Sequence, residues 1–494
     1  MLVLAFALSI ALGYLAITSV WPEQKPTRSG TMIKVSLAPG FGLGIFSVVF
    51  WLWRLSADAH LVAVDVLLLI LLALTCSVQR SRAPDALTSE CHTPDASVPK
   101  WLASILTASF AIAAIAALYH AAVRVVAHPH GEGWDAFAIW NLRARFLFLG
   151  GARWREGFNS LIPWSHPDYP LLLPAAIAHL WSYPGHDYPF VPAIVGLIFT
   201  FSTVALLVSS LLFLRGRNAA MLGGLALSST PFFSEQGTSQ YADVPLSFFI
   251  LASIVLQHIA WSHNRNRQPL RPMMLAGLAA GFAAWTKNEG VLFTLALMAV
   301  QLWAAIASVR QNSASGKSAR NRRLLVSFVM GAAPMLVLIA WFKHTIAAPG
   351  DLFSSSSVMM QKILTPARYW IILQWFAKEF LRFGNWWIIP GTVAMLAFYA
   401  LSFQRRKSES SPALPISALT LLLTLAGYFA IYLITPRDLY WHLRFSLNRL
   451  FLQLWPSSTF LFFLFVAPQT WPGSQAEPTS PQNRAIVKKF PSST

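Results

Sequence analysis

The chain has 494 residues, of which 55% are hydrophobic and only 11% are charged. Soluble domains carry about 25% charged residues, so this composition excludes an ordinary soluble protein. The formal net charge is +18, but most of the excess lies in short loops between apolar segments, where anionic lipid is a sufficient partner. We therefore expect a polytopic membrane protein that binds membrane lipid and no nucleic acid.

Apolar segments close to the roughly 20 residues that cross a bilayer recur along the whole chain. They predict an all-α protein with about 13 transmembrane helices. The segments are 1–20, 38–54, 61–77, 101–126, 188–214, 218–235, 244–261, 272–286, 290–309, 324–343, 385–404, 414–434 and 450–467. The first lacks a basic region and a cleavage site, which favours a retained helix over a signal peptide.

The Lys and Arg residues of the short loops set the orientation, because positive loops stay cytoplasmic. The basic loops all fall on one side only if the segment Pro170 to Tyr183 dips in or lies flat on the outer side without crossing. The loop 127–187 is then extracytoplasmic, and the expected location is the plasma (inner) membrane. Cys76 and Cys91 fall on the cytoplasmic side, so no disulfide is expected.

Composition divides the chain into three parts. Residues 1–100 hold three transmembrane segments and a cytoplasmic loop, and residues 101–467 form a transmembrane core. The tail 468–494 is rich in Pro, Ser, Gln and Thr, which predicts a disordered cytoplasmic segment.

The first outer loop begins with an amphipathic segment. Its apolar stripe, read at helical spacing, is Phe137, Trp140, Ala144, Leu147 and Phe148. Its polar arc is Asp135, Asn141, Arg143 and Arg145. This pattern predicts a helix that opens at Asp135 and lies in the membrane interface.

Four outer segments that are far apart in the sequence carry the other unusual polar residues. In chain order they contribute Asp135, Arg143 and Asp168, then Asp243, then Lys287 and Glu289, and finally His442, Arg444 and Arg449. Ionisable groups at membrane depth are costly, so Asp243 and Lys287 favour a functional interpretation. Their joint placement on one membrane face predicts a site there.

Each of these residues also has a structural explanation. The alternatives are a helix-dipole acid at Asp135, a turn residue at Asp168, a helix cap at Asp243, an ion pair of Lys287 with Glu289, and a snorkelling Arg449. None of the five is informative alone, so the site hypothesis depends on their clustering.

Four motifs resemble the GT-C superfamily of membrane glycosyltransferases. They are GWDAF with Asp135, SQYADVPLSFF with Asp243, AGLAAGFAAWTKNEG with Lys287, and NRLFLQLWP with Arg449 and Pro456. The chain is similar in particular to the protein O-mannosyltransferases and the lipid A aminoarabinose transferase, of glycosyltransferase family 39, over roughly residues 105–467.

The chain also departs from that pattern. The superfamily often has adjacent acidic residues in the first outer loop, whereas here Ala136 follows Asp135 and the nearest acid is Glu132. The three N-terminal spans are extra, and no large soluble domain follows the last span. Acceptor selection is therefore expected to come from the outer loops.

The resemblance implies a polyprenyl-phosphate sugar donor and a glycan, lipid or protein acceptor on the extracytoplasmic side. A hydroxyl that attacks the anomeric carbon needs a general base, for which we assign Asp135, with Asp243 orienting the substrates in an inverting reaction. The leaving phosphate needs cations, for which the candidates are Lys287, Arg444 and Arg449. The other residues expected to bind substrate are Arg143, Asp168, Glu289 and His442.

His128, His130 and Glu132 form an H-x-H-x-E cluster of ligand-type residues. Its close spacing in a loop with Pro and Gly favours a polar turn, so no cofactor is predicted and a divalent metal is the alternative. A transporter or flippase of lipid-linked sugars is the rival function, but it predicts charges along a path open to both sides. A structural scaffold would leave Asp243 and Lys287 unexplained.

Overall fold

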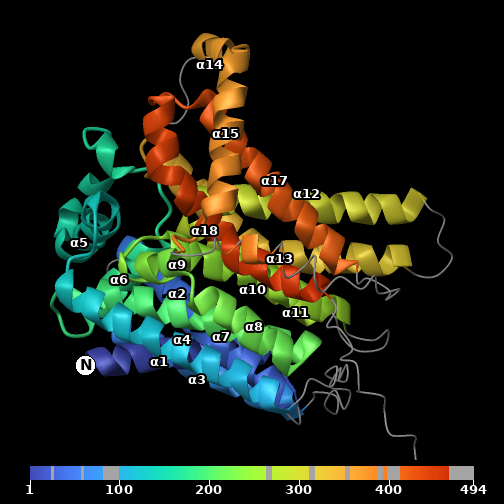
Figure 1. Cartoon of the computed structure of the whole chain (residues 1–494). Helices are drawn as coiled ribbons and strands as arrows, with labels where there is room; N and C mark the ends of the chain where they lie inside the picture. Colours follow the sequence, from blue (N-terminus) through green and yellow to red (C-terminus); the bar gives the residue numbers. More distant parts are fainter. Residues whose placement is uncertain are drawn as a thin grey trace, which may run out of the picture.

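The computed structural model describes residues 1–23, 27–56, 60–81, 100–262, 270–310, 317–350, 356–386 and 412–466, with a few positions between 391 and 397. Within these residues all regular secondary structure is helical, so the all-α prediction is confirmed. Most long helices lie side by side and run across the view in Figure 1, whereas α14, α15 and the first part of α18 project away from them.

Nine helices among the described residues are long and apolar enough to cross a membrane. They are α1 (Leu2–Val20), α2 (Arg28–Ser56), α3 (Leu61–Ser81), α4 (Lys100–Ala127), α7 (Phe190–Arg215), α10 (Asp243–Ser262), α12 (Asn288–Arg310), α13 (Lys317–Thr345) and α17 (Ala413–Ile434). The chain is therefore a polytopic membrane protein.

Two further predicted spans are also helical. They are α11 (Leu270–Thr286), with 17 residues, and α18 (Leu439–Phe465), with 27 residues. The second begins earlier than expected, so His442, Arg444 and Arg449 lie within a helix and not in a loop. Most of the predicted span 385–404, the tail 468–494 and Cys91 lie outside the described residues.

The predicted span 218–235 is wrong, because the chain breaks there into two short helices. These are α8 (Arg217–Ser228) and α9 (Pro231–Thr238), and Thr230 between them has an extended backbone. Proline lacks an N–H group and disfavours helical geometry in the residue before it, so Pro231 ends one helix and begins the next.

The predicted apolar stripe after Asp135 is correct at Trp140, Ala144 and Leu147, which are buried, but wrong at Phe137, and the predicted polar arc is wrong at two positions. Residues Ala136–Asn141 form a π-helix, η1, before α5 (Leu142–Leu149). The wider π turn shifts the phase of the faces, so Phe137 is exposed while Asn141 and Arg143 are buried. This segment therefore buries part of its polar arc together with most of its apolar stripe.

Helix α6 (Leu172–Ser182) has 11 residues, which at about 1.5 Å per residue is far too short to cross a bilayer. Its residues from Leu172 to Trp181 are buried, and it packs against α2, α5 and α7. The segment 170–183 therefore lies inside the helix bundle and not flat on a surface.

Helix α2 is an integral part of the bundle, although it precedes the expected core. It packs on α1, α6 and α7, and its Trp51 packs against Trp285 of α11, with ring centroids 6.3 Å apart. The indole N–H of Trp285 donates to the Ser47 hydroxyl at 3.0 Å. Helix α2 therefore supports the end of α11, two residues before Lys287.

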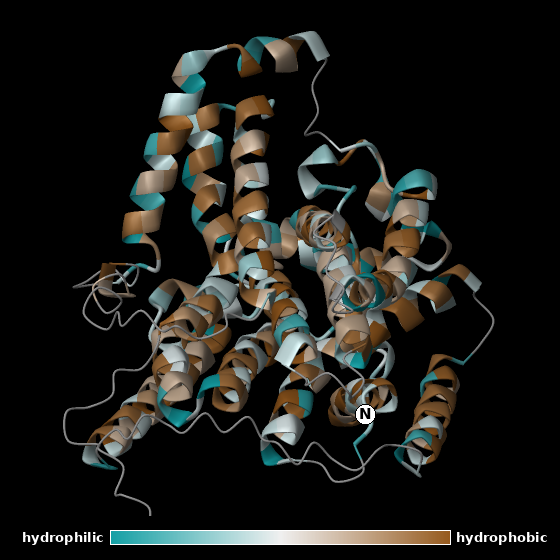
Figure 2. Ribbon diagram, turned by 90° about the vertical axis from the view of Figure 1, so that its right-hand side faces the viewer, coloured by the Kyte–Doolittle hydropathy of each residue, from teal (hydrophilic) through white to brown (hydrophobic). Residues whose placement is uncertain are grey.

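Two helices occupy the segment between α13 and the undescribed residues, and neither was predicted. They are α14 (Ser356–Ile363) and α15 (Pro366–Arg382). The upright helices in Figure 2 carry hydrophilic and hydrophobic residues together. Lys362 and Arg368 donate to the carbonyl oxygens of Thr435 and Leu433 at 2.6 and 3.1 Å, which satisfies the C-terminal end of α17.

Candidate active site

An ion pair between Asp243 and Lys287 forms the centre of the candidate site. Asp243 is the first residue of α10 and is 1% exposed. Lys287 lies in the one-residue gap between α11 and α12, and its Nζ is 2.9 Å from Asp243 Oδ1 and 3.0 Å from Glu289 Oε1. Asp243 and Glu289 each lie in the first turn of a helix, where the macrodipole favours a carboxylate.

Arg449 of α18 joins a third carboxylate, Asp135, to this group. Its guanidinium donates to Asp135 Oδ2, and its Nη1 lies 3.8 Å from Asp243 Oδ2. The guanidinium also lies over the Tyr241 ring, 5.1 Å from its centroid. Asp135, Asp243, Lys287, Glu289 and Arg449 form the charge network of the candidate site.

Two side chains that the sequence analysis did not single out fix Asp243 in place. Gln453 Nε2 donates to Asp243 Oδ1 at 2.6 Å, and the Tyr428 hydroxyl donates to Gln453 Oε1 at 2.7 Å. Gln453 follows Arg449 by one helical turn, so both point to the same face of α18. The sequence offered one signal for this contact, because Gln453 is a polar residue inside an apolar run.

The charge network keeps Lys287 protonated. Burial lowers the pKa of Lys287, but the carboxylates of Asp243 and Glu289 more than offset this effect and raise the pKa above its ordinary value. Burial, and then the charge of Asp135, raise the pKa of Tyr241. Lys287 is therefore a cation and Tyr241 a neutral phenol at physiological pH.

A second cluster adjoins the network through Asn288. Asn288 Nδ2 donates to Asp168 Oδ2 at 2.8 Å, and Lys343 Nζ donates to Asn288 Oδ1 at 2.9 Å and to Asp168 Oδ2 at 3.3 Å. Asp168 thus fixes the turn that carries Lys287. Lys343 lies at the end of an apolar span, where a cation is common. Its position in the sequence therefore did not mark it as a candidate site residue.

Arg143 is buried near this second cluster. It is 1% exposed, its Nη2 donates to the Ser165 carbonyl at 2.8 Å, and it lies over the Phe158 ring at 5.4 Å. Burial lowers the pKa of Arg143 to about 10, although the charge of Asp168 acts in the opposite direction. Its Nε and Nη1 have no hydrogen-bond partner within the described residues.

Two further predicted substrate-binding residues, His442 and Arg444, precede Arg449 on α18. His442 Nδ1 lies 2.9 Å from Thr435 Oγ1, and its ring packs on Tyr432. Arg444 is exposed and lies over the Phe445 ring. Both residues belong to the first turns of α18, toward its projecting end.

The acidic member of the H-x-H-x-E cluster has a cationic partner. Glu132 forms an ion pair with Arg124 near the end of α4. Within the described part of the chain, no group of three or more His, Cys, Asp or Glu side chains is arranged to hold a metal ion.

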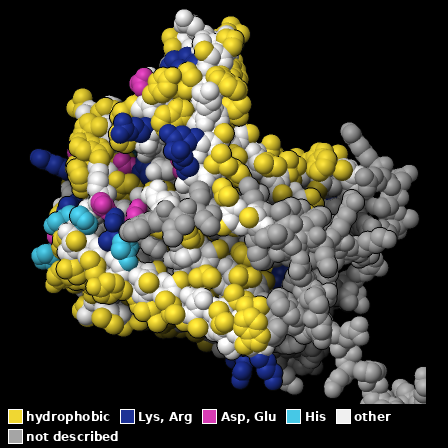
Figure 3. All heavy atoms as spheres, in the orientation of Figure 1, with side chains coloured by type: hydrophobic (Ala, Val, Ile, Leu, Met, Phe, Trp, Pro, Cys, Tyr) yellow, Lys and Arg dark blue, Asp and Glu magenta, His cyan; other side chains and the backbone are white. Residues whose placement is uncertain are grey.

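The surface near this end of the bundle is hollowed. Figure 3 shows Lys, Arg, Asp and Glu side chains gathered around a hollow between the end that carries α5 and the upright helices. Asp135 and Arg449 keep 25% and 18% of their side chains exposed, whereas Asp243 keeps 1%. The network is therefore open to solvent on the side of Asp135 and Arg449.

Residues 168–341 match the family described as dolichyl-phosphate-mannose-protein mannosyltransferase. The resemblance to GT-C membrane glycosyltransferases is thereby confirmed. The match supports membrane glycosyltransferase activity in a broad sense. It includes Asp168, Asp243, Lys287 and Glu289, whereas Asp135 and Arg449 lie outside it. The comparisons with curated proteins and with solved structures give no match.

Proposed function

We propose that the chain transfers a sugar from a polyprenyl-phosphate donor to a hydroxyl of a glycan, lipid or protein on the extracytoplasmic side. The observation that supports this most strongly is the single network of Asp135, Asp243, Lys287 and Arg449, drawn from four distant parts of the sequence. Transfer needs a carboxylate and phosphate-binding cations around one substrate, and the network supplies both.

Arg449 and Lys287 bind the donor phosphate in this proposal. The C1–O bond to phosphate breaks during transfer, and its electron pair leaves on the phosphate, so negative charge grows there. Arg449 offers a planar fork to phosphate oxygens, whereas Lys287 acts as a point charge. In a poorly hydrated site such fixed cations stabilise the leaving group strongly.

Asp135 is the general base, and its pairing with Arg449 implies an order of binding. The donor phosphate competes with Asp135 for the guanidinium of Arg449. When the phosphate binds, Asp135 is released to accept the proton of the acceptor hydroxyl as the oxygen attacks the anomeric carbon. A single displacement of this kind inverts the anomeric configuration.

Asp243 has a different role, because it is held on both oxygens. Lys287 and Gln453 bind Oδ1, and Arg449 lies near Oδ2. A carboxylate fixed in this way is a poor base but a good anchor, so Asp243 aligns Lys287 and Arg449 with the phosphate and orients the sugar.

The direct test is transfer by the full-length protein in lipid vesicles that contain a set of radiolabelled polyprenyl-phosphate sugars. Mass spectrometry of cell-envelope glycans with and without the protein identifies the sugar and the acceptor. We expect a glycan that depends on the protein and has inverted anomeric configuration. Movement of the lipid-linked sugar across the vesicle membrane without transfer would instead establish the flippase.

The side of the membrane is tested separately. Leu161 is 83% exposed in the first outer loop, and Arg217 is exposed at the start of α8. We expect a membrane-impermeant maleimide to label Leu161→Cys but not Arg217→Cys in intact cells, with Cys76 and Cys91 replaced by Ala. The reverse pattern would place the site on the cytoplasmic side.

A further inference from the structure

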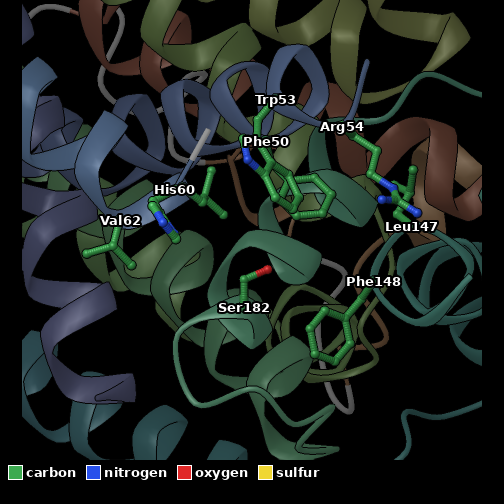
Figure 4. A pocket seen from close by; sticks show the side chains of 9 residues that line it. Phe50, Trp53, Arg54, His60, Val62, Leu147, Phe148 and Ser182 are labelled. Carbon is green, nitrogen blue, oxygen red and sulfur yellow. The ribbon is translucent and has the colours of Figure 1, made fainter. Parts of the chain in front are cut away.

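A cavity of about 360 Å³ lies between α2, α3, α5 and α6, away from the charge network. Figure 4 shows the side chains around it, and none of them belongs to the network. The lining residues are Phe50, Trp53, Arg54, His60, Leu61, Val62, Leu147, Phe148 and Ser182. Its volume is in the range of small-ligand sites. Most of the lining comes from α2 and α3, the N-terminal helices outside the family match.

The cavity contains a guanidinium that is held in place. Arg54 donates through Nη2 to the Gly151 carbonyl and lies over the Trp154 ring, 5.9 Å from its centroid. Its Nε is buried and has no hydrogen-bond partner within the described residues. An unpaired buried donor on a cation is costly, so an anion beside the guanidinium would be bound favourably through its charge. His60 lines the same cavity.

Apart from Ser182, the rest of the lining is apolar, and it continues onto an exposed apolar surface. Val62, on the rim, is 41% exposed, and Leu52 beside Trp53 is 52% exposed. Val66, Leu67, Ile70 and Leu71 continue this exposed apolar face along α3, a helix long enough to cross the membrane. A ligand that enters here therefore meets hydrocarbon on one side and the Arg54 cation on the other.

The wall behind the cavity is rigid. The Phe50 ring packs on His179 of α6 with centroids 5.9 Å apart. His179 Nε2 lies 2.7 Å from Asp65 Oδ2, and the Tyr183 hydroxyl donates to the same oxygen at 2.7 Å. His179 and Asp65 are fully buried. Packed aromatic rings and buried hydrogen bonds of this kind keep the cavity preformed.

We propose that this cavity binds the phosphate head group of a membrane lipid, with the phosphate at Arg54 and the acyl chains along α3. The combination of a fixed cation, an aromatic wall and continuity with lipid-facing surface fits an anionic amphiphile better than a soluble anion. The site is separate from sugar transfer and does not rest on the proposed function.

The test uses purified full-length protein and a fluorescent short-chain phosphatidic acid, with the matching diacylglycerol as a probe that lacks phosphate. Arg54→Gln removes the cation. Arg155→Gln is the matched control, because Arg155 is exposed and stacks on the same Trp154 ring at 5.3 Å without lining the cavity. Val62→Trp fills the cavity from its exposed rim and leaves every charge in place.

We expect phosphatidic acid to bind at least tenfold more tightly than diacylglycerol, since charge-assisted hydrogen bonds are strong. Arg54→Gln and Val62→Trp should each weaken its binding at least tenfold, and Arg155→Gln by less than twofold. If Arg54→Gln does not fold, as judged by its unfolding temperature, the binding of phosphatidic acid to Val62→Trp alone decides the test. Equal binding of both probes, unchanged binding in Val62→Trp, or equal competition by inorganic phosphate would overturn the proposal.

Discussion

Two of the clusters of buried ionisable groups in the described residues, the His179–Asp65 pair and the charge network, differ in composition and exposure. His179 and Asp65 are one base and one acid, both 0% exposed. The charge network holds three carboxylates and two cations, and Arg449 and Asp135 within it keep 18% and 25% of their side chains exposed. Burial alone therefore does not distinguish the candidate site from a structural pair. The candidate site differs in that several of its charges share partners next to solvent.

The hydrogen-bond partners of His179 indicate where protons lie on its ring nitrogens. Nδ1 lies 2.9 Å from the Phe46 carbonyl, which can only accept, so Nδ1 carries a proton. One further proton is shared between Nε2 and Asp65. The pair is neutral overall, and it ties α3 and α6 to α2. We therefore interpret it as a structural pair, in contrast to the charge network.

The largest effect is expected from Asp135→Asn. The amide keeps the shape of the side chain but cannot accept the acceptor proton, so transfer should fall by about 10² to 10⁴ while donor binding is retained. Asp187→Asn is the control, because Asp187 pairs with Arg145 at 3.0 Å outside the network. Full activity in Asp135→Asn would remove Asp135 from the mechanism.

His179→Leu should act on stability, because it leaves Asp65 buried without its base. Breaking a buried pair costs roughly 3–5 kcal/mol, whereas replacing both partners by apolar groups is often neutral. The double variant Asp65→Leu, His179→Leu should therefore recover much of the lost thermal stability. Scanning fluorimetry measures this. A double variant as unstable as the single one would show that the pair is not the source of the effect.

Arg449→Ala should weaken donor binding by roughly 10- to 100-fold and also reduce turnover, because phosphate is negative in both the ground and transition states. Equilibrium binding of a polyprenyl-phosphate sugar distinguishes this variant from Asp135→Asn. Equal loss of donor binding in the two variants would mean that Asp135 belongs to the donor site or to the structure.

The smallest effect is expected from Lys343→Met, which removes the cation that holds Asp168 and Asn288. Turnover should fall about tenfold, because the turn that carries Lys287 loses its support and Lys287 is then misplaced relative to the substrate. Lys343→Arg should restore part of the rate. Lys378→Met is the control, since Lys378 is exposed on α15 and stacks on Trp375. Equal rates in Lys343→Met and Lys378→Met would exclude the positioning role.

Hydropathy predicted most helices correctly, because lipid and a dry interior both select long apolar runs. Asp243 and Lys287 were found by the same reasoning, since a charge in an apolar setting needs a partner. Helix α15 was missed because its charges lower its hydropathy, and the break at Thr230 was missed because Pro231 lies inside an apolar run.

The parts of the site that were not predicted depend on contacts distant in sequence. Asp243 is bonded by Gln453, which is 210 positions away, and Asp168 is bonded by Lys343, which is 175 positions away. No local pattern in one sequence specifies such pairs. The burial of Arg143 was missed for a similar reason, because it depends on the Ser165 carbonyl and the Phe158 ring, which lie further along the loop.

The ion pair between Arg449 and Asp135 joins positions that are 314 residues apart, and this has a consequence for biosynthesis. Helix α18 is the last of the described helices to leave the ribosome. Until it inserts, the membrane holds a partly assembled bundle in which Asp135 and Asp243 lack their shared cation. The charge network is therefore complete only after α18 has been translated and inserted.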